Sequence, residues 1–461
     1  IQHVKAINVT GFSSNRRQSL AHLGILVTFA LIPFWYRFPQ SPPAFSLFYS
    51  LGFIIFWPML WTVVWWLVAG LPGWNSLWQN RAGRWWVLSL SALAFWALLS
   101  WAWSYTRVSN PAVTVSSAIP FVFAVLFALA TACLKPSISR VTTILIIGLA
   151  WNSVLTGLQV AQQGSVGLQF FGEFNLNPLR SGVVVVQAGD IRWLRPYGLL
   201  PHPNILAGFL VISLSVHTAW LTSQPRRLQL ILGTIIFVLG LWSLLLTFSR
   251  AAWMSYAAGL CVLFVSIWLC GRRCFAQRIR FIGILGLCAV LGGLFLLQYQ
   301  PFLAARTGLS EESIELRSIS DRAVYNQIAF EAIQDSPLLG VGIGNFPWYA
   351  AGYLRKTDFD LRGQPVHNIF LSACSELGLV GLVLLLVNLS AGLWAAFRLM
   401  SSASTHILRV GFASAVVALM IIGLLDHYPW TLIQFQVAWW AMFGIAVNPG
   451  LPSSEDALVE N

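Results

Sequence analysis

The stretch QLILGTIIFVLGLWSLLLTFSRAAWMSYAAGLCVLFVSIWLC, residues 229–270, decides the fold class of this chain. Arg250 is its only charged residue and divides it into two apolar runs. Each run has about 20 residues, the length that an α-helix needs to cross the hydrocarbon core of a bilayer. The stretch therefore predicts two consecutive membrane-spanning helices that nearly touch at Phe248, Ser249 and Arg250.

The composition of the whole chain agrees with this prediction. Of its 461 residues, 57% are hydrophobic and only 9% are Asp, Glu, Lys or Arg, whereas a soluble globular chain carries about 25% charged residues. A soluble protein could not keep so much apolar surface from water. We therefore expect an all-α, polytopic membrane protein. The formal net charge of +12 is explained by basic loops, so we expect no nucleic acid partner.

Apolar runs of the required length predict about twelve transmembrane helices. They lie near residues 20–37, 45–69, 85–103, 113–134, 141–160, 202–222, 229–248, 251–270, 279–298, 367–396, 407–425 and 430–447. The second and tenth runs are long enough to tilt or break. Two long loops, about 161–201 and 299–366, separate some of the spans, and we expect the larger loop to contain short helices.

The distribution of basic residues predicts the orientation of the spans. One set of short loops carries most of the Lys and Arg: Lys5, Arg16, Arg17, Arg81, Arg84, Lys135, Arg140, Arg226, Arg227, Arg272, Arg273, Arg278, Arg280, Arg398 and Arg409. The opposite short loops hold only Arg37, Arg107 and Arg250. We therefore predict a protein of the cytoplasmic (inner) membrane with both termini in the cytoplasm and both long loops extracytoplasmic. The N-terminal apolar run is interpreted as a retained span, not a cleaved signal.

Three regions follow from these patterns. Residues 1–201 form an N-terminal transmembrane scaffold with an outer loop, and no Asp or Glu occurs before Glu173. Residues 202–448 contain most of the polar residues that could carry chemistry, and residues 449–461 form a cytoplasmic tail. The six cysteines lie in or beside apolar runs, so we predict neither a disulfide framework nor a metal site.

Two arginines are candidates for binding an anion. Arg250, preceded by Ser249, is costly at the junction of two spans unless it meets a partner or water. The alternative is an arginine that reaches the lipid headgroups. Arg322 is predicted in the first turn of a helix that begins at a capping box, Ser318 to Asp321, and ends before Pro337. Its guanidinium suits phosphate, and the alternative is a salt bridge to a nearby acid.

A second group of candidates opens the tenth span. His367, followed by Asn368, lies at the mouth of this span and can act as a general base near neutral pH. The alternative is a hydrogen-bonded histidine at the membrane interface. Glu376 lies inside the same apolar run, where an acid is a functional candidate, although it could instead hold helices together.

Other polar residues lie at the ends of spans. Arg195 precedes His202 and Asn204, and Pro203 predicts a broken or late-starting span. The run Asp426 to Trp430 forms a similar polar connection between the last two spans. Either could position substrate or simply cap a helix. The segment Gly340–Asn345 could form an amide nest for an anion, but a tight turn is the favoured interpretation. A basic site at the outer rim, next to lipid, indicates an anionic amphiphile as ligand.

The ordered set of these motifs resembles the O-antigen ligase and polymerase superfamily over about residues 195–385. The motifs are Arg195 to Gly198, His202 to Asn204, Ser249-Arg250, Arg322 followed by Pro337 to Gly342, and His367-Asn368 with Glu376 to Gly378. One departure is Tyr325, where the family usually has Trp.

The resemblance implies an O-antigen ligase-like glycosyltransferase that is inverting, metal-independent and without a cofactor. Its donor would be a glycan on undecaprenyl diphosphate in the outer leaflet, and its acceptor a hydroxyl of a glycan, lipid or protein. Arg250 and Arg322 would bind the diphosphate, and His367 would orient or deprotonate the acceptor, supported by Asn368 and Glu376. Ligase, polysaccharide polymerase and protein O-oligosaccharyltransferase stay open as alternatives. So does a membrane transporter, because some relatives were labelled bicarbonate transporters.

Overall fold

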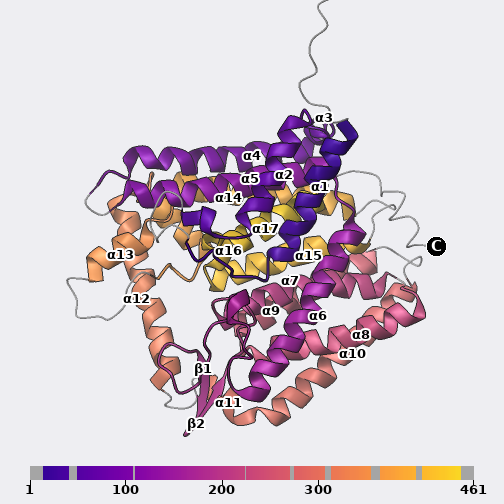
Figure 1. The fold of residues 1–461 in the computed structure, drawn as a ribbon. Coiled ribbons are helices and arrows are strands. Elements are labelled where there is room, and N and C mark those ends of the chain that lie inside the picture. Colours follow the sequence, from indigo (N-terminus) through magenta and orange to yellow (C-terminus); the bar gives the residue numbers. More distant parts are fainter. Residues whose placement is uncertain are drawn as a thin grey trace, which may run out of the picture.

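The computed structural model describes residues 14–40, 49–106, 109–223, 225–269, 275–306, 313–354, 364–400 and 407–447. These residues form helices and one short hairpin (Figure 1). The α-helices are α1 (Ser14–Leu31), α2 (Phe56–Val68), α3 (Trp74–Gln79), α4 (Arg81–Leu99), α5 (Pro111–Leu134), α6 (Ile138–Gln162), α7 (Pro203–Thr222), α8 (Arg227–Leu246), α9 (Arg250–Leu269), α10 (Phe275–Gln298), α11 (Gln300–Arg306), α12 (Ser313–Asp335), α13 (Phe346–Leu354), α14 (Ile369–Met400), α15 (Ile407–Leu425), α16 (Tyr428–Thr431) and α17 (Ile433–Ala446). The antiparallel hairpin pairs β1 (Val185–Ala188) with β2 (Ile191–Leu194).

Nine of the described helices are long and apolar enough to cross a membrane. This confirms a mostly helical, multi-pass chain. The other three predicted spans coincide with α1, α2 and α17, which are shorter or more polar. Helices α2 and α17 have 13 and 14 residues, and α1 begins with Arg16 and Arg17 in its first turn. The count of about twelve is therefore not confirmed, and the side of the membrane on which the loops lie stays a prediction.

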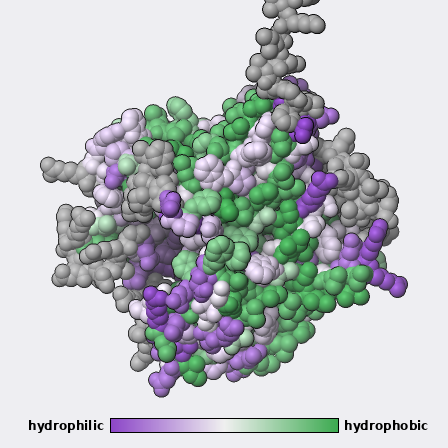
Figure 2. Space-filling model, in the orientation of Figure 1, coloured by the Kyte–Doolittle hydropathy of each residue, from purple (hydrophilic) through white to green (hydrophobic). Residues whose placement is uncertain are grey.

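Helix α7 is the centre of the bundle. It packs against α6, α8, α9 and α15, and 94% of its apolar window is buried. Around this centre, α14 packs on α4, α17 on α5, and α1 on α2. Figure 2 shows an apolar band across the visible face, with hydrophilic residues gathered near the β1–β2 hairpin and at the opposite edge. This is the distribution expected of a bundle that sits in lipid.

Helix α14 breaks at Gly378, whose φ of 69° is left-handed. The break frees backbone carbonyls, and the glycine-rich segment after α12 binds them. The amides of Val341 and Gly342 donate to the carbonyls of Ser375 and Glu376 at 3.0 and 2.8 Å. A Cβ on Gly378 would lie 2.1 Å from the Leu338 carbonyl oxygen, so this close packing requires glycine. The turn interpretation of this segment is thus supported. The tenth predicted span, which was long enough to tilt or break, is broken at Gly378.

Helix α12 corrects one prediction. It begins at Ser313, so Ser318 does not cap it and Arg322 does not lie in its first turn. The helix extends further toward the N-terminus because no proline or glycine interrupts residues 313–321. Its predicted end before Pro337 agrees with the structure. An apolar stripe of this helix, including Ile328 and Ala332, is buried against α13 and the start of α14.

The loop before α7 is organised around a buried carboxylate. Glu173 accepts hydrogen bonds from the amides of Val166 and Leu168 at 2.8 and 2.6 Å. Gln159, on α6, donates to Glu173 and accepts from the amide of Gly198 at 2.9 Å. Because Gln159 joins both segments, the last turns of α6 fix the backbone that leads into α7.

Candidate functional site

The start of α7 is built by His202 and Asn204. The amide of Asn204 donates to Nδ1 of His202 at 3.1 Å, so His202 caps the helix. Pro203 occupies the first helical position, where its missing N–H costs nothing. The predicted late start of this span is therefore observed. The side chain of Asn204 is left to bind neighbours from two other segments.

Arg195 ties this helix start to the junction between α8 and α9. Its side chain is 3% exposed. Its Nε donates to the carbonyl of Thr247, and its Nη2 donates to Oδ1 of Asn204, both at 2.6 Å. A buried guanidinium needs such partners, because an unpaired buried charge is costly. Arg195 therefore holds α7 and the α8–α9 junction in a fixed relation.

The α8–α9 junction is a sharp reversal. Phe248 has a φ of 51°, a left-handed conformation that is unusual for a bulky residue. Its ring is fully buried against Phe295 and Tyr299, and this packing holds the strained backbone. Ser249 is buried as well, and Arg250 is the first residue of α9. Arg250 therefore lies three residues after Thr247, whose carbonyl accepts a hydrogen bond from Arg195.

Asp426, directly after α15, is the second partner of Asn204. Nδ2 of Asn204 donates to Oδ2 of Asp426 at 3.0 Å. The other oxygen of Asp426 accepts from the backbone amide of His427 at 2.9 Å. The carboxylate is 4% exposed. It therefore lies between the start of α7 and the connection that follows α15.

His427 and His367 lie together on the other side of Asp426. Their rings meet edge to face with centroids 5.2 Å apart. Nδ1 of His427 is 2.7 Å from Oγ1 of Thr431, and its Nε2 is 3.8 Å from Oδ1 of Asp426. Nδ1 of His367 is buried and has no hydrogen-bond partner in the described part of the chain. We call Arg195, Asn204, Asp426, His427 and His367 the Asp426 network.

The positive charge of Arg322 lowers the pKa of both His367 and His427. Burial lowers the pKa of His427 to about 4, although Asp426 opposes this shift, and Arg322 lowers it further. The pKa of His367 is lowered in the same way by burial and by Arg322, again against Asp426. Both imidazoles are therefore neutral near pH 7. Arg322, on α12, and His367, before α14, act on each other although they lie on different elements.

The pKa values of His202 and Asp426 also fit the partners of these two residues. Burial and then the charge of Arg195 lower the pKa of His202 to about 3, so His202 is a neutral cap. Burial alone would raise the pKa of Asp426. The neighbouring histidines His427, His367 and His202 and the His427 amide lower it by more, so Asp426 is ionised.

The hydrogen bonds of Asn368 and Glu376 hold helices in place. Oδ1 of Asn368 accepts from the amides of Phe370 and Leu371 at 2.9 and 3.0 Å and so caps α14. Its Nδ2 donates to the carbonyl of Leu424, two residues before Asp426. Glu376, which is 2% exposed, accepts from Nε1 of Trp430 at 2.9 Å. Asn368 therefore fixes His367 relative to α15, whereas Glu376 joins α14 to α16.

His367, Asp426 and His427 could also hold a metal ion. One ligand atom from each residue lies within 4.8 Å of the others. Two imidazoles and a carboxylate are a common set of zinc or iron ligands. The nearby guanidinium of Arg322 opposes a cation here, since it already lowers the pKa of both histidines. The same charge would attract an anion.

The structure thus links most of the sequence candidates and adds two residues. Hydrogen bonds join Arg195, His202 and Asn204, and electrostatic interaction joins Arg322 to His367. Asp426 and His427 were noted in the sequence only as a polar connection. The sequence feature that could have indicated them is an acid and a histidine directly after a predicted span, on the same predicted side of the membrane as His367.

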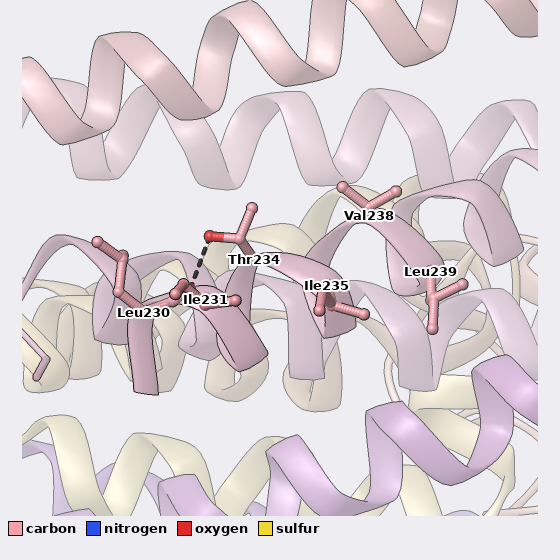
Figure 3. A pocket seen from close by; sticks show the side chains of 6 residues that line it. All are labelled: Leu230, Ile231, Thr234, Ile235, Val238 and Leu239. Carbon is pink, nitrogen blue, oxygen red and sulfur yellow. Dashed lines mark hydrogen bonds between the residues drawn. The ribbon is translucent and has the colours of Figure 1, made fainter. Parts of the chain in front are cut away.

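An apolar groove on α8 is separate from this network. It has a volume of about 480 Å³ and is lined by Leu230, Ile231, Thr234, Ile235, Val238 and Leu239 (Figure 3). The hydroxyl of Thr234 donates to the carbonyl of Leu230 in the same helix. The lining of the groove is thus almost entirely apolar, as expected of a lipid-facing surface. None of the candidate site residues lines it.

Comparison with known proteins shows that part of the chain is similar to one family. A search of curated proteins found no match to the chain. Residues 235–386 match the family model described as O-antigen ligase. The matched segment contains Arg250, Arg322 and His367, and it ends before Asp426. The match confirms the resemblance to the O-antigen ligase superfamily over residues 235–386.

Proposed function

We propose that this protein transfers a glycan from undecaprenyl diphosphate to an acceptor hydroxyl at the outer face of the cytoplasmic membrane. The observation that carries the proposal is the neutral His367, which lies beside His427 and within the electrostatic reach of Arg322. A neutral imidazole next to a guanidinium combines a proton acceptor with an anion-binding group. The match to the O-antigen ligase family supports this reaction class.

In the proposed reaction, the acceptor oxygen attacks the anomeric carbon as the bond from that carbon to the diphosphate oxygen breaks. His367 takes the proton of the acceptor hydroxyl, and undecaprenyl diphosphate leaves with the bonding electrons. Attack from the face opposite the diphosphate inverts the anomeric centre. Asp426 stabilises the positive charge that develops on the histidine pair, since it raises the pKa of His367 and His427.

The two arginines have separate positions in this scheme. Arg322 approaches from α12 and stabilises the negative charge that grows on the diphosphate. Arg250 begins α9, and Arg195 holds the preceding junction through the Thr247 carbonyl. We therefore assign Arg195, His202 and Asn204 to positioning and Arg250 to diphosphate binding with Ser249. Two guanidinium groups supply the charge compensation that a metal ion would otherwise give.

A transfer assay in proteoliposomes tests the proposal. Purified full chain is supplied with a glycan on undecaprenyl diphosphate and with an acceptor, and the product is separated by mass. Arg250→Ala and Arg322→Ala are each expected to lower the transfer rate by about 100-fold or more, the effect of losing one charge-stabilising group. The matched control is Arg227→Ala, an exposed arginine that starts α8.

The choice of acceptor separates the remaining possibilities. Transfer to a lipid-linked core glycan indicates a ligase, transfer to a second donor molecule indicates a polymerase, and transfer to a serine peptide indicates a protein glycosyltransferase. Full activity of both arginine variants would contradict the mechanism. Uptake of bicarbonate by the same proteoliposomes, without glycan transfer to any acceptor, would favour the transporter alternative.

A further inference from the structure

Thr431 is the last residue of the short helix α16 (Figure 1), and its hydroxyl contacts the imidazole of His427. Oγ1 of Thr431 is 2.7 Å from Nδ1 of His427. Residues four apart in a helical turn face each other, so this turn places the hydroxyl beside the ring. The proton between the two atoms can belong to either of them, and its position determines what His427 can do in a reaction.

Helix α16 is held from both sides, so the position of Thr431 is fixed. The amides of Trp430 and Thr431 donate to the carbonyl of His427 at 2.9 and 3.2 Å. Nε1 of Trp430 donates to Glu376 on α14 at 2.9 Å, and the carbonyl of Trp430 accepts from Gln436 on α17. Helices α14 and α17 therefore position the turn that carries both His427 and Thr431.

The ring of His427 has one proton, which lies on one of its two nitrogens. The imidazole is neutral near pH 7, so one nitrogen donates and the other accepts. Nε2 lies 3.8 Å from Oδ1 of Asp426, which is ionised. A lone pair on Nε2 would be repelled by this carboxylate, whereas an N–H would be attracted to it. The proton of His427 therefore lies on Nε2, toward Asp426.

With Nε2 protonated, Nδ1 of His427 can only accept a hydrogen bond. Its donor is the hydroxyl of Thr431, whose other contact, with the carbonyl of His427, is longer at 3.4 Å. The hydroxyl has a single proton, and only the 2.7 Å contact has the length of a good hydrogen bond. Both nitrogens of His427 are thus occupied, and the ring has no lone pair left for the proton of a substrate.

His367 differs from His427 in the partners of its ring. The two rings meet edge to face, with centroids 5.2 Å apart. Nδ1 of His367 has no hydrogen-bond partner among the residues that the structure describes, so no bond at this nitrogen fixes the tautomer of the ring. His367 can therefore keep its proton on one nitrogen and offer the lone pair of the other to an acceptor hydroxyl.

We propose that Thr431 is a positioning residue that makes His367, and not His427, the base of the reaction. By donating to Nδ1, Thr431 keeps the proton of His427 on Nε2 and the ring turned toward Asp426. His427 stays a neutral donor beside the carboxylate, and the proton of the acceptor hydroxyl passes to His367. The role of Thr431 rests on the proposed glycan transfer, whereas the tautomer of His427 does not.

Nitrogen NMR of isotopically labelled histidine tests the tautomer without any substrate. The full chain is measured in detergent at neutral to mildly basic pH, and His427→Gln identifies the His427 signals by their absence. We expect a protonated Nε2 and an unprotonated Nδ1 in wild-type protein. Thr431→Val keeps the shape of the side chain but removes the donor, so its spectrum should show a mixture of tautomers. A protonated Nδ1 or a mixture in wild-type protein would overturn the proposal.

Transfer assays in proteoliposomes test the role of Thr431 in the reaction. We expect Thr431→Val to lower kcat by about tenfold, the usual effect of losing a partner that orients a catalytic group, and to change KM by less than about twofold. Thr431→Ser keeps the hydroxyl and should retain most of the wild-type rate. The matched control is Thr234→Val. Thr234 is also partly buried, and its hydroxyl bonds the Leu230 carbonyl of its own helix (Figure 3), so its loss should leave the rate unchanged.

The results distinguish a failure of this proposal from a failure of the proposed function. A wild-type rate in Thr431→Val, or a loss in Thr431→Ser as large as that in Thr431→Val, would overturn the role of Thr431. An equal loss in Thr234→Val would overturn it too, since any threonine of the bundle would then have the same effect. Wild-type protein that transfers glycan to no acceptor would overturn the proposed function, while the NMR spectrum would still report the tautomer of His427.

Discussion

The two polar ends of the bundle differ in burial and in the partners of their charges. In the Asp426 network, Arg195 and Asp426 are 3% and 4% exposed, and Asn204 hydrogen-bonds to both. At the other end, where α5 leads into α6, Lys135 and Arg140 are exposed. The network therefore has its geometry determined by hydrogen bonds within the protein, whereas the two cations at the other end are reached by solvent.

This difference separates what each end can do. Catalysis requires groups held in a defined geometry, and buried hydrogen bonds provide it. Exposed cationic side chains at an aqueous interface are adaptable instead. We therefore expect substitutions in the network to change the reaction, and substitutions at the exposed Lys135 and Arg140 to leave it largely unchanged.

The largest expected effect is at Asp426. Asp426→Asn keeps the shape of the side chain but removes the charge that stabilises His367 and His427. We expect the transfer rate to fall by about 10- to 100-fold, the usual effect of losing a group that supports a catalytic residue. Lys135→Gln should leave the rate within about twofold of wild type, because exposed charges contribute little to a distant site. A large loss in the Lys135 variant would break the comparison.

Arg195→Met tests whether the network is a structural connection. The substitution keeps the apolar stem but leaves the Thr247 carbonyl and Oδ1 of Asn204 without their donors. We expect the free energy of unfolding to decrease by about 1–3 kcal/mol per unsatisfied group, measured as a lower thermal midpoint in detergent. Arg140→Met, at the other end, should change the midpoint little. Equal shifts in the two variants would contradict the assignment.

The pH dependence of transfer reports on His367. Its pKa lies below the ordinary value of 6.5, so the imidazole stays neutral as the pH falls from 8 to 6.5. Because the reaction needs the neutral form, kcat/KM should be flat over this range and should decrease only below pH 6.5. Asp426 raises the pKa of His367, so Asp426→Asn should move the acidic limb to still lower pH. A limb at or above 6.5 in wild-type protein would argue against His367 as the base.

The smallest expected effect is that of metal removal. His367, Asp426 and His427 are close enough to share a metal ion, but the charge of Arg322 beside them opposes a cation. Treatment with a chelator, followed by transfer assays in metal-free buffer, should leave the rate unchanged. Loss of activity with recovery on adding Zn²⁺ or Mn²⁺ would assign the three residues to a metal centre.

Local apolarity predicted much of the fold. Runs of apolar residues located the long helices to within a few residues, and Pro203 marked the start of α7. The candidate site was predicted less completely. Arg322 was proposed from its place in a loop helix and His367 from the mouth of a span; their roles stay predictions, and the start of α12 was misplaced. Asp426 and His427 were noted only as part of a polar connection, because neither residue type nor spacing shows which span ends meet.

The sequence by itself determined that this is a helical membrane protein with its polar residues at the ends of spans. The hydropathy of a segment depends only on its own side chains, so it can be calculated from the sequence alone. It does not distinguish α7 from α10, which are both long and apolar, although 94% of the most apolar segment of α7 is buried and only 17% of that of α10. Only the tertiary structure decided which helix is central and joined Asn204 to Asp426, 222 residues apart. Such a contact depends on how distant helices pack, and no local pattern specifies that packing.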